Sequence, residues 1–130
     1  MTTVLITGAS GFIGKRLSCH LAQRHRVICM SRKNPGLNLP WIKGTFTSFE
    51  YLAQVDRYRI DTLVHLGAVT GGMTERDCFL VNVEGTRCLL KYLITRGCRK
   101  FVLASSIAAV GFQDPLFRPT QLPIKDEHIC

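Results

Sequence analysis

The sequence is short of acidic residues and has no long apolar run. Nine Asp and Glu stand against seventeen Lys and Arg, which gives a formal net charge of +8. This balance favours anionic partners such as nucleotides and phosphates. The basic residues are scattered along the chain, which is typical of a solvated surface and argues against nucleic acid as the partner. No apolar stretch approaches the roughly 18 residues of a membrane-spanning helix, so we expect a soluble protein without a membrane partner.

Cysteine pairs with metal-ligand spacing are also absent. None of the six cysteines forms a C-x-x-C pair. Two of them, Cys19 and Cys29, fall within a helix and a strand that are predicted below. We therefore expect reduced, mostly buried thiols, no metal site and a cytoplasmic location. The first strand follows Met1-Thr-Thr without a basic segment, so no signal peptide is expected.

The most informative segment, residues 4–17, combines a strand, a turn and the start of a helix. The run from Val4 to Ile6 is short and apolar, which is typical of a strand buried on both faces of a parallel sheet. A helix must follow almost at once, because apolar residues then recur near the spacing of one helical face. These residues are Phe12, Ile13, Leu17, Leu21 and Ala22.

Three glycines, spaced three residues apart, join this strand to this helix. Gly8 permits a tight turn, Gly11 lets a pyrophosphate approach the backbone, and Gly14 lets the helix pack closely on the sheet. Free N–H groups and the positive end of the helix dipole would then face the phosphates. A glycine-rich turn without a ligand is the alternative interpretation.

The segment Thr7-Gly-Ala-Ser-Gly-Phe-Ile-Gly14 resembles the extended short-chain dehydrogenase/reductase family, the NAD(P)-dependent sugar-nucleotide epimerases and dehydratases. The resemblance implies an α/β fold with a three-layer, Rossmann-like parallel sheet of order 3-2-1-4-5, truncated after the fifth strand. Residues 1–110 would form the N-terminal part of an NAD(P)-binding domain. Residues 111–130, with three prolines and no sustained period, are expected to form an irregular arm.

Ser31 and Arg32 lie at the end of the second predicted strand, Arg26–Met30, where such folds recognise the adenosine ribose. An acidic residue there would take the ribose hydroxyls of NAD and repel a 2′-phosphate. Ser31, Arg32 and Lys33 have the opposite electrostatics. We therefore expect NADP, with NAD as the less favoured cofactor; a basic loop without a ligand is the alternative.

A short third strand is expected over residues 41–45. In the family this strand commonly ends in Gly-Asp, where the Asp reaches the adenine, but here the pair is Gly44-Thr45. This departure leaves adenine recognition at this point open.

The fourth strand and its exit, residues 61–69, contain His65-Leu-Gly-Ala68, which resembles the family signature His-Leu-Ala-Ala. The small residues Gly67 and Ala68 would let the cofactor lie against the backbone. His65 invites a catalytic reading, but no Ser-Asp arrangement lies nearby. We interpret it as a packed histidine at a strand end.

A helix is predicted from about Glu75 to Arg96, with Gly97 as its stop. Within it, Asn82-Val-Glu-Gly-Thr86 matches the family motif Asn-Val-x-Gly-Thr, whose Asn supports the loops around the cofactor. The sequence does not separate core scaffolding from cofactor contact for Asn82.

The fifth strand, residues 100–106, leads into Ser106-Ile-Ala-Ala-Val-Gly111, which resembles the family segment Ser-Ser-x-x-x-Tyr-Gly with Val110 in the place of Tyr. Ser106 then falls at the catalytic serine, which hydrogen-bonds the substrate oxygen. Two serines that satisfy loop N–H groups are the alternative.

The general base of the family, a Tyr in Tyr-x-x-x-Lys, is missing. Four residues after Tyr51, Tyr58 and Tyr92 stand Val55, Thr62 and Arg96. We therefore interpret the chain as an N-terminal piece of such an enzyme, inactive alone, with Pro123–Glu127 resembling the segment that precedes the catalytic Tyr. Apolar surface left on strands 4 and 5 or their helix would favour a homo-oligomer.

The predicted function is the NAD(P)-binding portion of an oxidoreductase or epimerase that transfers a hydride on a nucleotide sugar or similar carbonyl/alcohol substrate. A non-catalytic module that senses a dinucleotide, or binds protein or RNA, is the alternative. Ser106 is the predicted catalytic residue. The predicted cofactor-binding residues are Gly8, Ser10, Gly11, Phe12, Ile13, Gly14, Ser31, Arg32, Leu66, Gly67, Ala68, Asn82 and Ser105.

Overall fold

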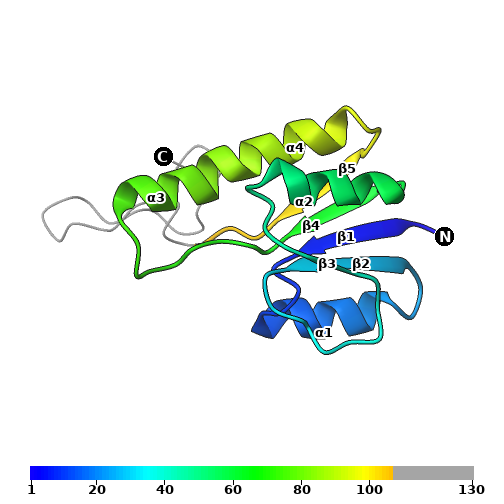
Figure 1. The fold of residues 1–130 in the computed structure, drawn as a ribbon. Helices are drawn as coiled ribbons and strands as arrows, with labels where there is room; N and C mark the ends of the chain where they lie inside the picture. The colour runs from blue at the N-terminus through cyan, green and yellow to red at the C-terminus, as the bar shows by residue number, and fades with distance from the viewer. Residues whose placement is uncertain (107–130) are drawn as a thin grey trace, which may run out of the picture.

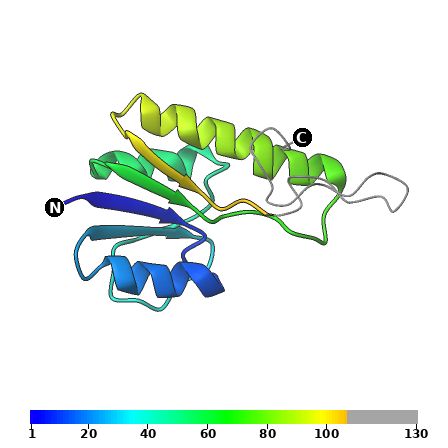
Figure 2. The same cartoon turned by 180° about the vertical axis from the view of Figure 1, so that it is seen from behind.

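A computed structural model describes residues 1–106 of the chain. The expectations for the arm 111–130, for Val110 and for Pro123–Glu127 lie outside the described residues. Five parallel strands form one sheet of order β3-β2-β1-β4-β5. Helix α1 covers one face of this sheet, and α2 and α4 cover the other (Figures 1 and 2). The predicted three-layer α/β fold and its strand order are therefore confirmed.

Each strand and helix lies close to its predicted place. In chain order the elements are β1 (Thr3–Thr7), α1 (Phe12–Leu21), β2 (Arg26–Ser31), β3 (Trp41–Lys43), α2 (Phe49–Ala53), the 3₁₀ turn η1 (Gln54–Arg57), β4 (Thr62–His65), α3 (Glu75–Phe79), the π-helical turn η2 (Leu80–Gly85), α4 (Thr86–Ile94) and β5 (Lys100–Leu103).

The core has two parts, one on each face of the sheet. Side chains alternate along β1, so Val4 and Ile6 face α1 while Leu5, fully buried, faces α2 and α4. Leu17 and Leu21 of α1 pack on the first part. Complete burial of a leucine side chain, as at Leu5, contributes about 1.5–3 kcal/mol.

Phe12 and Ile13 were expected on the packed face of α1, and this expectation is wrong. Their side chains are 76% and 61% exposed, whereas Leu17 is half-buried against the sheet. The first turn of α1 extends past the carboxyl edge of the sheet, so side chains there have no strand to pack on. The Arg16 guanidinium stacks 4.0 Å from the centre of the Phe12 ring.

The expected helix over residues 75–96 is present but contains a π-helical turn, η2, between α3 and α4. Sequence periodicity gave no sign of it. The left-handed Gly97, with φ of +84°, follows the helix as its predicted stop, and the N–H of Cys98 bonds the carbonyl of Leu93 across it. Single π turns inside helices often lie at functional sites.

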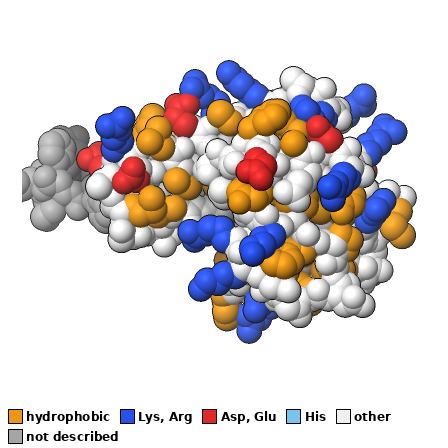
Figure 3. All heavy atoms as spheres, in the orientation of Figure 1, with side chains coloured by type: hydrophobic (Ala, Val, Ile, Leu, Met, Phe, Trp, Pro, Cys, Tyr) orange, Lys and Arg blue, Asp and Glu red, His pale blue; other side chains and the backbone are white. Residues whose placement is uncertain are grey.

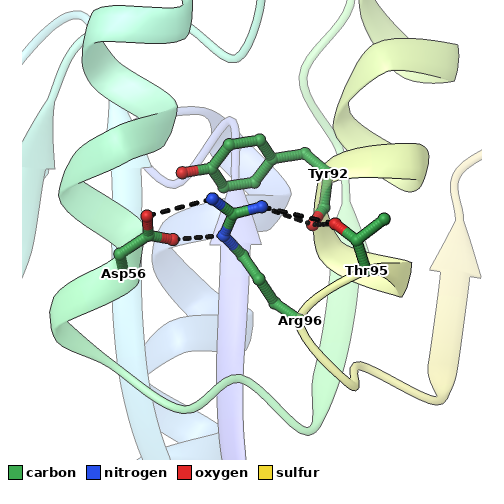
Figure 4. Close-up of polar contacts among 4 residues, drawn as sticks. All are labelled: Asp56, Tyr92, Thr95 and Arg96. Carbon is green, nitrogen blue, oxygen red and sulfur yellow. Dashed lines mark hydrogen bonds and ion pairs between the residues drawn. The ribbon is translucent and has the colours of Figure 1, made fainter.

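Arg96 ties the end of α4 to η1 (Figure 4). Its guanidinium hydrogen-bonds both carboxylate oxygens of Asp56, one of them at 3.1 Å, and stacks 3.5 Å from the centre of the Tyr92 ring. These bonds hold the pKa of the Asp56 carboxyl below its ordinary value. The pair links segments 40 residues apart on the outside of the α2/α4 layer.

Apolar surface is exposed where β5 forms the sheet edge, but β4 does not share it. Val102 and Leu103 are 54% and 58% exposed, while Leu63 of β4 is fully buried. The expectation of exposed apolar surface on strands 4 and 5 or their helix is thus met at β5 and on the helix that follows β4, where Phe79 and Ile94 are exposed, but not at β4. Self-association stays a prediction.

The cysteines follow their expected pattern only in part. Cys29 and Cys98 are buried, but Cys19 and Cys88 are exposed. Within residues 1–106 no cysteine forms a disulfide, and no cluster of His, Cys, Asp and Glu has the arrangement of a metal site. In the same range, no helix is long and apolar enough to cross a membrane.

We predict that Gly14→Ala destabilises the fold. The added Cβ would lie 2.2 Å from the Gly8 carbonyl oxygen and 2.8 Å from Ala9 Cα, and backbone atoms cannot move aside cheaply. Gly to Ala in an unobstructed site stabilises a protein by about 0.4–1 kcal/mol, but overpacking of this kind costs about 1–3 kcal/mol. Urea unfolding should therefore show a lower free energy of unfolding.

Gly11→Ala is the matched control, because its Cβ would meet only the Gly8 oxygen, at 3.2 Å. Equal stability of Gly14→Ala and the wild type would contradict the tight contact between α1 and the turn.

Candidate functional site

The carboxyl ends of β1, β2, β3 and β4 meet at one edge of the sheet, and a cavity of about 420 Å³ lies there. In Figure 1 this is the edge to which the strand arrows point. The cavity is lined by Gly8, Ser10, Gly11, Met30, Ser31, Arg32, Gly44, Thr45, Phe46, Thr47, Leu66, Gly67, Ala68, Val69, Met73 and Val81. A volume of this size lies within the range of small-molecule and cofactor sites.

The turn after β1 forms one wall from backbone alone. Gly8 has a φ of +69°, and a Cβ there would lie 2.9 Å from the Gly67 nitrogen of the opposite wall. Gly11 is exposed and is the N-cap of α1, whose first turn carries no acidic residue. The first N–H groups of a helix lack intrahelical partners. The N-terminus of α1 therefore presents the favourable end of the helix dipole to an anion at this wall.

Ser31 and Arg32 form the rim after β2 in different ways. The Ser31 hydroxyl, nearly buried, donates to the Lys33 carbonyl at 2.8 Å, and the Ser31 carbonyl accepts from Trp41 Nε1 at 3.2 Å. Ser31 thus fixes the shape of the loop. Arg32 is exposed, and it is the one charged residue among the described residues that line the cavity. Figure 3 shows Lys and Arg spread widely over one face of the molecule, with fewer acidic side chains between them.

Thr45, Phe46 and Thr47, which follow β3, were not predicted as site residues. The hydroxyls of Thr45 and Thr47 lie 3.0 Å apart, within hydrogen-bond distance. The Phe46 ring lies edge-on to His65, with ring centres 4.6 Å apart. The predicted position of β3 in the sheet could have indicated these three residues, because in a parallel sheet the residues that follow each strand lie at the same edge.

Asn82 holds the wall after β4 and lies outside the cavity lining. Its Oδ1 accepts from the Val69 N–H and its Nδ2 donates to the Val69 carbonyl, both at 2.8 Å. The π turn η2 places Asn82 for this double contact. The geometry favours support of the cofactor loop; direct contact between Asn82 and a cofactor stays a prediction.

Glycines also let the walls after β3 and β4 approach each other. A Cβ on Gly67 would lie 2.8 Å from the Phe46 ring, and a Cβ on Gly85 would lie 2.7 Å from the Thr47 methyl group. The Gly in the family motif Asn-Val-x-Gly-Thr therefore has a packing role in this chain. It brings the helix down onto the loop that follows β3.

His65 is buried at the end of β4, as expected for a packed histidine. Its Nδ1 lies 2.6 Å from Thr7 Oγ1 and its Nε2 lies 2.9 Å from Thr86 Oγ1. Burial lowers the pKa of the imidazole from 6.5 to about 4. His65 is therefore neutral near pH 7 and does not line the cavity.

The structure brings most of the predicted cofactor residues together. Eight of them line the cavity: Gly8, Ser10, Gly11, Ser31, Arg32, Leu66, Gly67 and Ala68. The remaining predicted residues lie outside its lining: Phe12, Ile13, Gly14, Asn82, Ser105 and Ser106. Gly14 acts in packing, and Ser105 and Ser106 continue the chain beyond β5, where the Ala104 N–H bonds the His65 carbonyl at 3.0 Å. The catalytic role of Ser106 stays a prediction.

Solved structures share this fold over nearly all of the chain. A short-chain dehydrogenase/reductase superfamily protein from Agrobacterium tumefaciens with bound NAD is 31% identical, with a TM-score of 0.83 over 98% of this chain and 39% of that one. MoeE5 in complex with UDP-glucose and NAD is 30% identical, with a TM-score of 0.74 over 86% of this chain and 39% of its own.

Proteins related in sequence include two oxidoreductases. The dTDP-4-dehydro-6-deoxyglucose reductase of Escherichia coli is 31% identical over 121 residues, and a 3-beta-hydroxysteroid dehydrogenase of Mycolicibacterium neoaurum is 34% identical over 134 residues. The chain spans only 38% and 36% of their lengths, while the alignments cover 79% and 92% of the chain itself. Residues 4–128 match the NAD dependent epimerase/dehydratase family. With the glycine turn, the strand order and the cavity in place, the chain belongs to this family.

Proposed function

We propose that this chain is the dinucleotide-binding part of an oxidoreductase or epimerase that acts by hydride transfer on a nucleotide sugar or a similar carbonyl/alcohol substrate. The observation that carries the proposal is the cavity between the β1 and β4 loops, walled by backbone at Gly8, Gly11 and Gly67. NAD-bound relatives with the same fold support it.

The residues present fit a dinucleotide. Gly11 is exposed at the N-terminus of α1, and a side chain there would project where phosphates need to approach. None of the described lining residues is acidic, so nothing in this lining repels an anion. When bound, a nicotinamide dinucleotide supplies the acceptor or donor of the hydride. The chain itself holds the phosphates at the turn and closes the opposite side with Leu66, Gly67 and Ala68.

Arg32 favours NADP over NAD in this proposal. Arg32 is exposed at the cavity rim, and within residues 1–106 it forms no ion pair. An arginine can form two parallel hydrogen bonds with a phosphate, which NADP offers at the 2′ position and NAD does not.

The first test is Gly11→Val, which should greatly weaken dinucleotide binding in calorimetry. The branched side chain would occupy the path of the phosphates, while its Cβ would come within 3.4 Å of one backbone atom only, the Gly8 oxygen at 3.2 Å. Gly11→Ala serves as the intermediate control. Circular dichroism should show the same folded spectrum for all three proteins. Unchanged affinity in Gly11→Val would remove the central claim.

The second test titrates NADP and NAD against the wild type and Arg32→Ala. Hydrogen bonds to charged groups contribute about 1.5–3 kcal/mol, so the substitution should weaken NADP binding by about tenfold or more and leave NAD nearly unchanged. Lys43→Ala, which removes an exposed charge outside the cavity lining, is the control. A wild type that prefers NAD would overturn the assignment of Arg32.

The third test expects no turnover by this chain alone. The sequence contains no Tyr-x-x-x-Lys, and a missing positioned base typically lowers the rate by about 10²–10⁴-fold. Consumption of reduced nicotinamide should be followed by absorbance with dTDP-4-dehydro-6-deoxyglucose, using the Escherichia coli reductase as the positive control. Robust turnover would show that another group serves as the base.

A further inference from the structure

Three linked hydrogen bonds, one buried and two partly buried, run behind the β4 wall of the cavity. Thr7, at the end of β1, lies fully buried between the Gly67 N–H at 3.2 Å and His65 Nδ1 at 2.6 Å. His65 Nε2 continues the chain to Thr86 Oγ1 in α4, at 2.9 Å. These hydrogen bonds join β1, the loop after β4 and α4. One end of the series is the backbone N–H of Gly67, which lines the cavity.

The donors and acceptors in this series of hydrogen bonds determine which atom carries each hydrogen. The Gly67 N–H can only donate, so Thr7 Oγ1 accepts it. Within residues 1–106, the one acceptor that the Thr7 hydroxyl hydrogen reaches is His65 Nδ1. Nδ1 must carry no hydrogen, so in a neutral ring the hydrogen sits on Nε2 and is donated to Thr86 Oγ1.

We propose that His65 is a positioning residue: as the neutral Nε2–H tautomer it orients the Thr7 hydroxyl, which in turn holds the Gly67 amide in the cavity wall. The hydrogen-bond geometry alone supports the tautomer of His65 and the position of the Gly67 amide. The effect of this positioning on cofactor affinity rests on the proposed function.

A protonated ring would break this arrangement. Nδ1 would then carry a hydrogen, and Thr7 Oγ1 would face two N–H donors while its own hydrogen lost its acceptor. The groups packed on the ring are Thr7 from β1, Thr86 from α4 and the Phe46 ring, and none of them titrates near neutral pH or carries a charge to offset an imidazolium.

The pH dependence follows from the lowered pKa of His65. The folded ring titrates at about 4, and its ordinary value is 6.5. Between these two values the unfolded chain binds the extra proton and the folded chain does not, so acidification favours unfolding there. The contribution of His65 is fully present above pH 6.5 and is lost as the pH falls towards 4.

The first experiment is nitrogen NMR of the ¹⁵N-histidine-labelled chain without any cofactor, recorded as a pH titration. His65 is expected to show the Nε2–H pattern, with Nδ1 unprotonated, and to stay neutral well below pH 6.5, the ordinary pKa of an imidazole, until the pH nears its own pKa of about 4. A His65 ring with its hydrogen on Nδ1, or one whose pKa is near the ordinary 6.5, would overturn the proposal.

The second experiment compares Thr7→Val with Thr7→Ser. Valine has the shape of threonine but lacks the hydroxyl, whereas serine keeps it. The Gly67 amide should exchange its hydrogen about tenfold faster in Thr7→Val, and Thr7→Ser should stay near the wild type. Exchange in Thr7→Val equal to that of the wild type would contradict the positioning role, and the NMR result on the unmodified chain decides the tautomer even where Thr7→Val folds poorly.

Dinucleotide affinity supplies the link to the proposed function. Calorimetry should show about tenfold weaker binding in Thr7→Val and rescue in Thr7→Ser. In the wild type, affinity should fall as the pH approaches 4, where the folded His65 ring takes up its proton. If the wild type binds no dinucleotide while its tautomer and Gly67 exchange are as expected, the proposed function fails and the positioning of Gly67 stands. Normal affinity in Thr7→Val would overturn the effect of this positioning on the cofactor.

Discussion

The contact between α1 and the turn that follows β1 determines how the rest of the structure is arranged. Gly14 lies so close to the Gly8 carbonyl that no side chain fits between them. This contact places the helix N-terminus directly beyond the carboxyl end of β1, beside the cavity that Gly8, Ser10 and Gly11 line. A longer distance would leave Leu17 and Leu21 without the sheet against which they pack. The same glycine spacing therefore serves folding through Gly8 and Gly14, and leaves Gly11 available for a ligand.

The opposite side of the cavity is built by a second set of close contacts. Gly67 and Gly85 both pack against Phe46 or its neighbour Thr47, so the loops after β3 and β4 and the helix from Glu75 converge on one aromatic ring. His65 lies edge-on to the same ring and bonds Thr7. Two strands that pair side by side, β1 and β4, are thus also joined behind their ends. Such cross-links keep a wall made of glycine backbone in one conformation, which glycine alone would not do.

Sequence reasoning succeeded where the signal is local and periodic. The apolar run before Gly8 and the glycine spacing were enough to predict β1 and α1, and the family resemblance that they carry implied the strand order. It failed where a residue's environment comes from elsewhere in the chain. Phe12 matched the helical period but lies past the sheet edge, and Phe46 became a wall residue only because β3 ends beside β1 and β4. The π turn places Asn82 against Val69, 13 residues away in the sequence, and a helical pattern carries no information on such a contact.

The charge of the cavity depends on a pair of differences from the family pattern. Where the family commonly carries Asp after the third strand, this chain has Thr45, and the second strand ends in Ser31 and Arg32 instead of an acid. Both positions line the cavity, so an Asp in place of Thr45 would bring a negative charge into the same space as the guanidinium. Arg32 is exposed, and water and salt screen an exposed charge over about 10 Å. Its field alone therefore discriminates little between ligands. Selectivity requires direct, charge-assisted contact with a phosphate oxygen, which the absence of a competing carboxylate in this lining leaves open.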